Sequence, residues 1–456
     1  MKILPITIMQ YEPVFRKILW VLEILCMVYV LHPINAIAPI TGAFVLTFLI
    51  LFRPKLELTP LFYGVSFLVF WLLVSAVANY NLFFNKTVSR WLWIFEYYLS
   101  FVGCLILLRT KEDFIKLLQC FTGMTLVFGF FGYLELLFTP KLDWLFHLFR
   151  ADNLHAYFQE FIRVTSTQAW TNVAFAGTIF DLGAFLCLAV ALNLFKADRY
   201  YSGIFWLGLA VCESVLVFYT FERQPLVLLI FGFIGELIYW TIMNGSKWKI
   251  ALFTCFLVGT ILTGVLSFTP AGNSFKRLQS TVIYHDQTAE SIKQDPSSYG
   301  RLRLTYMGWV IMLDHPLFGI GLHNFQYIVQ NTKKYSDIYP EALPGHYDSK
   351  VSSSHNVLTH AGSDAGIPAM IAVTFITFWS GSLLIKYFQV IRATSILSDA
   401  AIGVMGMAIL VILIVPFDYS LINKAEGMAF FLIWAFLTSF EKIIVEALSK
   451  EAIFNE

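Results

Sequence analysis

Long apolar runs recur along the whole of this chain and limit what it can fold into. The 456 residues are 58% hydrophobic and only 13% charged, whereas about a quarter of a soluble domain is charged. A run of about 20 apolar residues spans a bilayer as a helix, because a helix satisfies its own backbone polar groups. The sequence therefore predicts an all-α integral membrane protein with about 12 transmembrane helices. The predicted spans are approximately 14–32, 36–52, 61–79, 88–108, 114–138, 172–195, 201–221, 224–243, 248–268, 366–388, 398–418 and 424–446.

Basic residues in the short loops set the predicted orientation, because cytoplasmic loops carry an excess of Lys and Arg. If the N-terminus is cytoplasmic, every inside turn contains Lys or Arg. The short outside loops then carry only Lys86, Arg90, Arg223 and Lys424. We therefore expect both termini to lie in the cytoplasm.

Two longer intervals, approximately 139–171 and 269–365, fall on the outside and hold eight of the nine histidines. We expect residues 1–268 to form helices 1–9, including the shorter outer loop. Residues 269–365 form a large, partly helical extracytoplasmic loop that carries the chemistry, and residues 366–456 form helices 10–12 and a cytoplasmic C-terminus. The sequence contains no P-loop or GxGxxG fingerprint, and nothing in its net charge of +1 indicates a nucleic-acid partner.

The six cysteines all fall inside predicted spans. Buried cysteine usually behaves as a small hydrophobic residue. We therefore expect neither a disulfide framework nor a metal–thiolate site.

The large outer loop contains a helical pattern of its own. Tyr299–Leu313 is rich in Leu, Met and Trp, and the pattern ends at Asp314-His315-Pro316. The stretch LFGIGLHNF follows, and its glycines Gly319 and Gly321 predict tight backbone turns. We expect this apolar content to lie against the bilayer surface or to pack on the helices.

The loop ends in SSSHNVLTHAGSDAGIPA, in which His355 and Asn356 precede the predicted start of the next span. Loops held by a rigid scaffold often carry a general base. A nucleophilic Ser–His pair is disfavoured because no GxSxG elbow occurs. A metal site at His355, His360 and Asp364 is disfavoured because HExxH spacing is absent. From the residues alone, His355 is either a general base or a loop histidine with structural partners.

Ionisable side chains inside spans are costly and are functional candidates. The clearest cases are Glu96, Asp181 and Glu213, which the predicted topology places in the outer half of the membrane. Each either forms a helix–helix hydrogen bond or lines a polar cavity that holds substrate.

Four arginines lie in or next to the outer segments: Arg163, Arg223, Arg301 and Arg303. A guanidinium binds phosphate oxygens in a bidentate manner, so converging arginines suit a diphosphate. The alternative is that each contacts solvent or a lipid headgroup. Sequence spacing does not show whether they converge.

Two stretches resemble the O-antigen ligase and O-antigen polymerase superfamily, membrane glycosyltransferases of bacterial envelopes. Gly300–Phe325, GRLRLTYMGWVIMLDHPLFGIGLHNF, is similar to that family's Arg-containing helix followed by His-Pro-Leu-x-Gly-x-Gly. His355–Ala369 resembles the His-Asn element of the ligases, although Ala369 stands where they usually have Gly, Thr or Tyr. In addition, Glu222-Arg223-Gln224 replaces the family's Ser-Arg-Gly, and Ser166 replaces the glycine of its Arg-x-x-Gly. With its helix number and late outer loop, the resemblance covers most of the chain.

The resemblance implies an inverting, metal-independent glycosyltransferase of the bacterial inner membrane that needs no cofactor and whose active site faces the periplasm. It would move a glycan from undecaprenyl diphosphate to an acceptor hydroxyl, with lipid A–core as the favoured acceptor. His355 would be the general base, and Arg301 and Arg223, with Arg163, would stabilise charge on the diphosphate. The expected substrate-binding residues are Arg163, Arg303, Asn356, Glu96, Asp181, Glu213 and His323.

Several functions stay open within and outside this class. The acceptor is lipid A–core in a ligase, a second lipid-linked repeat in a polymerase, or a protein hydroxyl. From a different class, a transporter or flippase of lipid-linked sugars also fits about twelve helices with acidic groups in the membrane.

Overall fold

The computed structural model describes residues 10–31, 36–56, 58–138, 173–220, 223–245, 296–339, 353–393, 395–414 and 424–454, together with short pieces between 249 and 264. All regular structure in these ranges is helical. The helices are α2 (Glu12–Leu31), α3 (Ile37–Phe52), α4 (Pro60–Ala78), α5 (Tyr80–Leu107), α6 (Lys111–Phe138), α8 (Val173–Lys196), α9 (Tyr200–Tyr219), α10 (Arg223–Asn244), α14 (Pro296–Asp314), α15 (Phe325–Asn331), α16 (Lys333–Ser336), α17 (Val357–Lys386), α18 (Phe388–Ala393), α19 (Ser395–Ile414) and α20 (Lys424–Phe454).

Eight of the described helices are long and apolar enough to cross a membrane, and two shorter apolar helices accompany them. Each predicted span except 248–268 corresponds to one of the described helices. The residues of that remaining span lie mostly outside the described part of the chain. The all-α membrane architecture predicted from the apolar runs is therefore confirmed.

The transmembrane helices share one large apolar core. In one half of the bundle, α8 is central, because it packs against α6, α9, α10 and α19. In the other half, α5 packs against α3, α4 and α20. Helix α17 joins the halves, with α4 on one side and α19 on the other.

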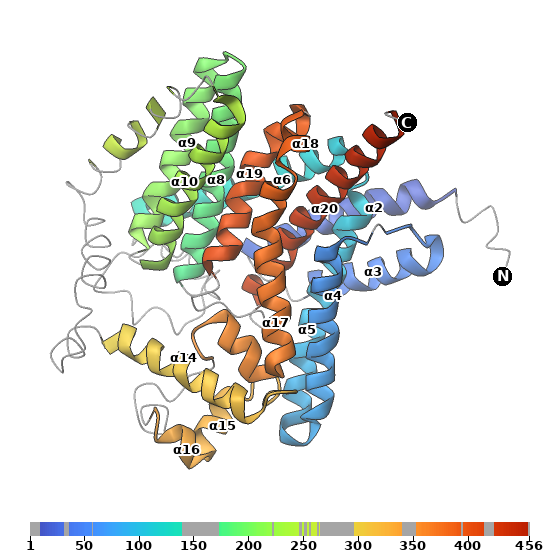
Figure 1. The fold of residues 1–456 in the computed structure, drawn as a ribbon, viewed down its shortest axis with the longest axis vertical. Helices are drawn as coiled ribbons and strands as arrows, with labels where there is room; N and C mark the ends of the chain where they lie inside the picture. The colour runs from blue at the N-terminus through green and yellow to red at the C-terminus, as the bar shows by residue number, and fades with distance from the viewer. Residues whose placement is uncertain are drawn as a thin grey trace.

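A second, smaller core lies at one end of the bundle, where α14, α15 and α16 gather beside the start of α17 (Figure 1). Helix α14 confirms the helical pattern predicted over Tyr299–Leu313. Its residues Leu304, Met307 and Ile311 face this core at helical spacing, and Phe325 and Tyr335 cover them. The predicted outer loop thus contains a packed helical unit.

Asp314, at the end of α14, ties that helix to α16. Its carboxylate accepts hydrogen bonds from Lys334 Nζ (2.8 and 2.6 Å) and from the Tyr335 hydroxyl (2.9 Å). The bonds from the Lys334 ammonium hold the pKa of Asp314 below its usual value. Burial, with the Asp314 carboxylate as a second cause, raises the pKa of Tyr335.

Candidate functional site at a broken membrane helix

Helix α17 begins earlier than the sequence predicted, at Val357 rather than at residue 366. Asn356 is its N-cap: the Asn356 side-chain oxygen accepts hydrogen bonds from the backbone N–H groups of Leu358 (3.0 Å) and Thr359 (3.1 Å). Such a cap satisfies donors that the first turn leaves free. The substrate-binding role predicted for Asn356 is untested, and its structural role is the start of α17.

The predicted start of the span is in fact a break within α17. Gly366 has φ 80° and ψ −179°, a conformation that glycine adopts without strain. Two residues later, Pro368 has no N–H to donate to the carbonyl of Asp364. The Gly-Ile-Pro sequence therefore divides α17 into a short first part and a long second part.

The HPLFGIG loop, residues 315–321, supplies the hydrogen bonds that the break removes. In a continuous helix, the carbonyl groups of Ser363 and Asp364 would accept from the residues four positions later. Here the N–H of Ile320 donates to Ser363 (2.8 Å), and the N–H of Gly321 donates to Asp364 (2.9 Å). The freed carbonyl groups thus accept hydrogen bonds from a loop that is distant from them in the sequence.

The same loop also accepts a hydrogen bond and approaches α17 closely. The N–H of Ile367 donates to the carbonyl of Pro316 (2.8 Å). A Cβ atom on Gly366 would overlap the carbonyl oxygen of Leu317, and one on Gly319 would overlap the α17 backbone. Glycine is required on both sides of this contact.

Helix α4 supplies the third part of the junction. The Ser75 hydroxyl lies 2.7 Å from the carbonyl oxygen of Phe318 and 2.9 Å from that of Asp364, and can donate to either. The indole N–H of Trp71 donates to the carbonyl of Ala365 (2.9 Å). We call this meeting of α4, the HPLFGIG loop and the broken α17 the junction.

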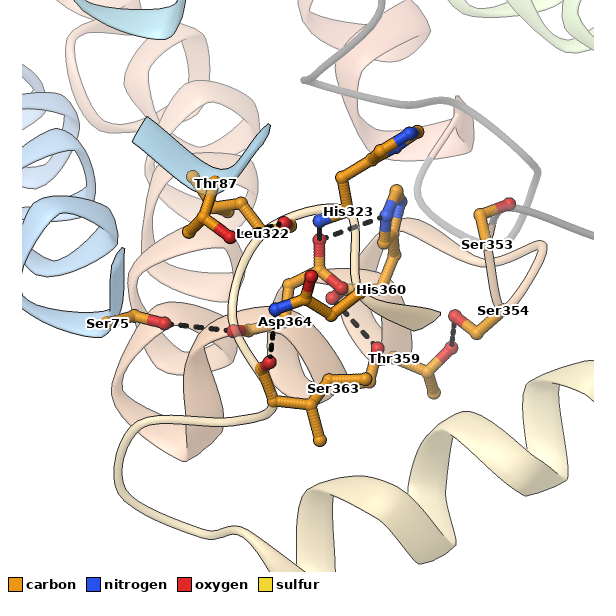
Figure 2. Close-up of polar contacts among 12 residues, drawn as sticks. Ser75, Thr87, Leu322, His323, Ser353, Ser354, Thr359, His360, Ser363 and Asp364 are labelled. Carbon is orange, nitrogen blue, oxygen red and sulfur yellow. Dashed lines mark hydrogen bonds and ion pairs between the residues drawn. The ribbon is translucent and has the colours of Figure 1, made fainter. Parts of the chain in front are cut away.

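Asp364 also joins two histidines in the first part of α17 and the adjoining loop (Figure 2). Nε2 of His360 lies 3.3 Å from Oδ2 of Asp364, and the two side chains are only 8% and 2% exposed. The backbone N–H of His323 reaches the same carboxylate oxygen at 3.5 Å. The imidazole of His323, predicted to bind substrate, extends away from this pair (Figure 2).

His355 lies just before α17 with a left-handed backbone, φ 55°. Non-glycine residues in this region cost about 1–3 kcal/mol and cluster at functional sites. Its N–H donates to the Ser353 hydroxyl (3.4 Å). The neighbouring Ser354 is held from two sides, by the Thr359 hydroxyl (2.7 Å) and by a hydrogen bond from Thr305 of α14 (3.1 Å). The half-buried imidazole is therefore carried on a fixed backbone.

Helix α14 presents one face to this segment. A Cβ atom on Gly308 would lie 2.6 Å from the Ser354 side chain and 3.0 Å from that of Thr359. Thr305 shares this face, and Arg301 precedes Thr305 by one turn. The Arg301 side chain is exposed. Arg301 therefore lies one helical turn from Thr305, whose hydrogen bond fixes Ser354, the residue before His355.

Arg303 lies on a different face and serves the small core. Its guanidinium donates from Nε to the carbonyl of Ile338 (3.0 Å), and a second guanidinium nitrogen contacts the same oxygen. The group also lies over the Tyr339 ring, 5.1 Å from its centroid. Arg163 lies outside the described residues, and Arg223 begins α10 with a side chain that is not described. Of the four predicted arginines, Arg301 is the one whose described position lies on the face of α14 that meets the segment before α17.

The acidic residues of the spans lie elsewhere in the bundle. Glu96 is half-buried on α5, whereas Asp181 on α8 and Glu213 on α9 are 0% and 3% exposed. Among the described residues, neither oxygen of Asp181 has a hydrogen-bond partner. Glu236 on α10, also fully buried, is a third such acid that our sequence analysis did not select, although the same rule for charges inside spans would have found it. Asp181 and Glu213 lie on α8 and α9, not on the helices that form the junction.

The pairing of His360 with Asp364 was also missed. The sequence alone predicts a loop at these positions, whereas their separation of four places both side chains on one helix face once α17 begins at Val357. The hydrogen bonds from Ser75 and Trp71 to the break could not be predicted from the sequence, because each is an ordinary residue inside an apolar span.

Fold and site together define a multi-pass membrane protein with a histidine-bearing site where a broken helix meets a helical loop. Residues 203–374 match the Wzy_C family model, described as O-antigen ligase. The match confirms the resemblance to the O-antigen ligase and polymerase superfamily, and it supports a membrane glycosyltransferase of this type. It runs from α9 into α17 and so includes Arg223, Arg301, the HPLFGIG loop and His355. A comparison with curated proteins finds no match.

Proposed function

We propose that this protein is an inverting, metal-independent glycosyltransferase that moves a glycan from undecaprenyl diphosphate to an acceptor hydroxyl. Lipid A–core is the favoured acceptor, which would make the protein an O-antigen ligase. The proposed site faces the periplasm from the inner membrane. The observation that carries the proposal is the position of His355, on a fixed backbone between the start of α17 and the face of α14 that bears Arg301.

In the proposed reaction, His355 takes the proton of the acceptor hydroxyl as its oxygen attacks the anomeric carbon. The bond from that carbon to the diphosphate oxygen breaks, and its electron pair leaves with undecaprenyl diphosphate. Attack from the opposite face inverts the configuration at the anomeric carbon.

Two features support binding of the leaving diphosphate near His355. Arg301 offers a guanidinium fork from α14. The N-terminal end of α17, capped by Asn356, favours negative charge through the helix dipole. Arg163 and Arg223 belong to the same proposal as further diphosphate contacts.

One feature, the broken helix α17, supports the alternative that the protein transports lipid-linked sugars. Transporters use the backbone groups freed at such a break to bind substrate. At this junction the HPLFGIG loop and α4 already satisfy the carbonyls of residues 363–365. The break is therefore better explained as a structural joint that positions the first part of α17.

A transfer assay tests the proposal. Purified wild type and His355→Ala would receive lipid-diphosphate-linked glycan and two acceptors, a lipid A–core and a second lipid-linked repeat, with chelator present. Lys333→Ala is the control, because Lys333 is an exposed residue of α16 outside the junction and the His355 segment. We expect wild type and the control to glycosylate lipid A–core, and His355→Ala to fail.

Other products would change the conclusion in defined ways. A ladder of lengthened lipid-linked repeats would identify a polymerase. Full activity of His355→Ala would show that this histidine is not the base. If wild type transfers sugar to neither acceptor but moves the lipid-linked glycan across vesicle membranes, the protein is a transporter.

A further inference from the structure

An apolar stripe on α14 is exposed at the surface of the described part of the protein. Leu302, Tyr306, Trp309 and Leu313 recur at intervals of four, three and four residues, which places them on one helix face. Their exposed fractions are 63%, 60%, 41% and 66%. We call these four residues the α14 stripe.

The stripe is a third face of α14, separate from the two that pack on protein. Leu304 and Ile311 are buried in the small core, and Thr305 and Gly308 meet the start of α17. A helix face directed to water normally carries charged and polar residues. A continuous row of Leu, Tyr and Trp with this exposure instead indicates an apolar environment.

An aromatic stack connects the segment after α14 to the lipid-facing surface of α4. Phe318 stacks on Trp71 with ring centroids 5.9 Å apart, and Trp71 stacks on Phe67 at the same distance. Leu317, beside Phe318, is 60% exposed. The exposed apolar surface therefore continues from the end of α14 onto a membrane-spanning helix.

The face of α4 reached by this stack is an exposed apolar face of a helix long enough to cross a membrane. Tyr63, Phe67, Phe70 and Val77 are 44–60% exposed on a 19-residue apolar span. Trp71 is seven residues from the end of α4, which is about 10 Å along the helix axis. The HPLFGIG loop thus packs beside α4 within its apolar span, and α14 ends where this loop begins.

We propose that α14 lies in the surface of the bilayer, with the α14 stripe inserted among the acyl chains of the adjacent leaflet. Tyr and Trp rings favour the boundary between headgroups and acyl chains. The exposed Arg301 on a neighbouring face suits lipid phosphates. The inference does not depend on the proposed function, because it rests only on the stripe and its continuity with α4.

Membrane insertion of the stripe would set the depth of the candidate site. Helix α14 contacts the residue next to His355 through the hydrogen bond from Thr305 to Ser354. Since α14 and this segment are packed together, anchoring one fixes the height of the other relative to the bilayer. A lipid-linked reactant would then meet His355 near the level of its own headgroup.

Fluorescence quenching of the full-length protein tests the position of the stripe. An environment-sensitive fluorescent amino acid would replace Leu313 in one variant and Lys333 in a control; Lys333 is an exposed residue of α16. Both variants would be placed in nanodiscs of phosphatidylethanolamine and phosphatidylglycerol. The quenchers are aqueous iodide and a phospholipid that carries a nitroxide near the top of its acyl chain.

We expect the nitroxide lipid to quench the probe at position 313. We also expect iodide to quench this probe at least about threefold less than the probe at position 333. Equal iodide quenching at both positions would show that the stripe faces water. Protection of position 313 from both quenchers would show that protein covers it, such as a second copy of the chain. Either of these results overturns the inference.

Discussion

Two polar regions of this membrane protein differ in how their groups are satisfied. At the junction, the backbone groups freed by the break in α17 find partners in the HPLFGIG loop and in α4. In the α8–α10 half, Asp181, Glu213 and Glu236 are sealed among helices, and several of their oxygens have no hydrogen-bond partner among the described residues. The first arrangement fixes the first part of α17, which His355 directly precedes, whereas the second consists of acidic side chains that are at most 3% exposed.

The comparison affects how the acidic residues are interpreted. Asp181 and Glu213 were predicted to bind substrate, and this stays a prediction. Their burial favours the other alternative that the sequence left open, a role between helices.

The largest effect on stability is expected for Gly366→Ala. Its φ of 80° is strained for alanine, and the new Cβ would overlap the Leu317 carbonyl. We expect a loss of roughly 3 kcal/mol in the free energy of unfolding, measured by thermal unfolding in detergent. The matched control is Gly123→Ala in α6, where a Cβ would meet no atom within 4 Å. Equal stability of the two variants would contradict the account of the junction.

Arg301 and Arg303 should respond differently to the same substitution. Arg301→Lys removes a guanidinium fork from the proposed diphosphate site, so the transfer rate should fall about 10²-fold with thermal stability unchanged. Arg303→Lys removes contacts with Ile338 and Tyr339, so it should lower the melting temperature and change the rate little. Rate and melting temperature measured on both variants decide this, and the reverse pattern would exchange the two roles.

A smaller effect is expected when the Ser75 hydroxyl of α4 is removed from the junction. Ser75→Ala leaves the carbonyls of Phe318 and Asp364 with one donor fewer, at a cost of about 1–2 kcal/mol. Ser382→Ala is the control, because Ser382 is exposed and donates only to a carbonyl of its own helix, that of Trp379. If chemical unfolding shows the same change for both serines, the link from α4 to the break contributes nothing.

The smallest effect concerns the ion pair between Asp314 and Lys334. Because the folded pKa of Asp314 is lowered, the pair stabilises the fold above the unfolded pKa, and this contribution disappears as the pH falls through the folded pKa. Lys334→Met should cost less than about 1 kcal/mol at neutral pH, since water screens the exposed pair. Thermal unfolding should show the wild type and the variant converging as the pH falls below the folded pKa of Asp314. A difference that persists there would have another cause.

The sequence predicted the bundle well because transmembrane helices are specified locally. An apolar run must form a helix in lipid, whatever its neighbours are. The predicted spans other than 248–268, and the loop helix over Tyr299–Leu313, therefore have counterparts among the described helices. Local rules also marked His355, Asn356 and the glycines of the HPLFGIG loop. What failed was the start of α17, because Gly-Ile-Pro is typical of a helix boundary.

The missing information was a partner distant in sequence. The chain is helical on both sides of the break at Gly366, and residues 316, 320 and 321 satisfy the backbone groups that the break frees. Nothing in the local sequence of 355–369 reveals that contact. For the same reason, spacing alone could not separate Arg301, on the face of α14 towards α17, from Arg303, on the face towards Tyr339.

We propose that the chemistry belongs to the segment that carries His355 and not to the buried acids. The most direct test compares His355→Gln with Glu213→Gln in one transfer assay, with equal amounts of folded protein confirmed by thermal unfolding. We predict that His355→Gln lowers the rate by about 10²–10⁴-fold, as loss of a general base does, and that Glu213→Gln stays within about threefold of wild type. A rate loss confined to Glu213→Gln would contradict the account and would move the site into the α8–α10 half of the bundle.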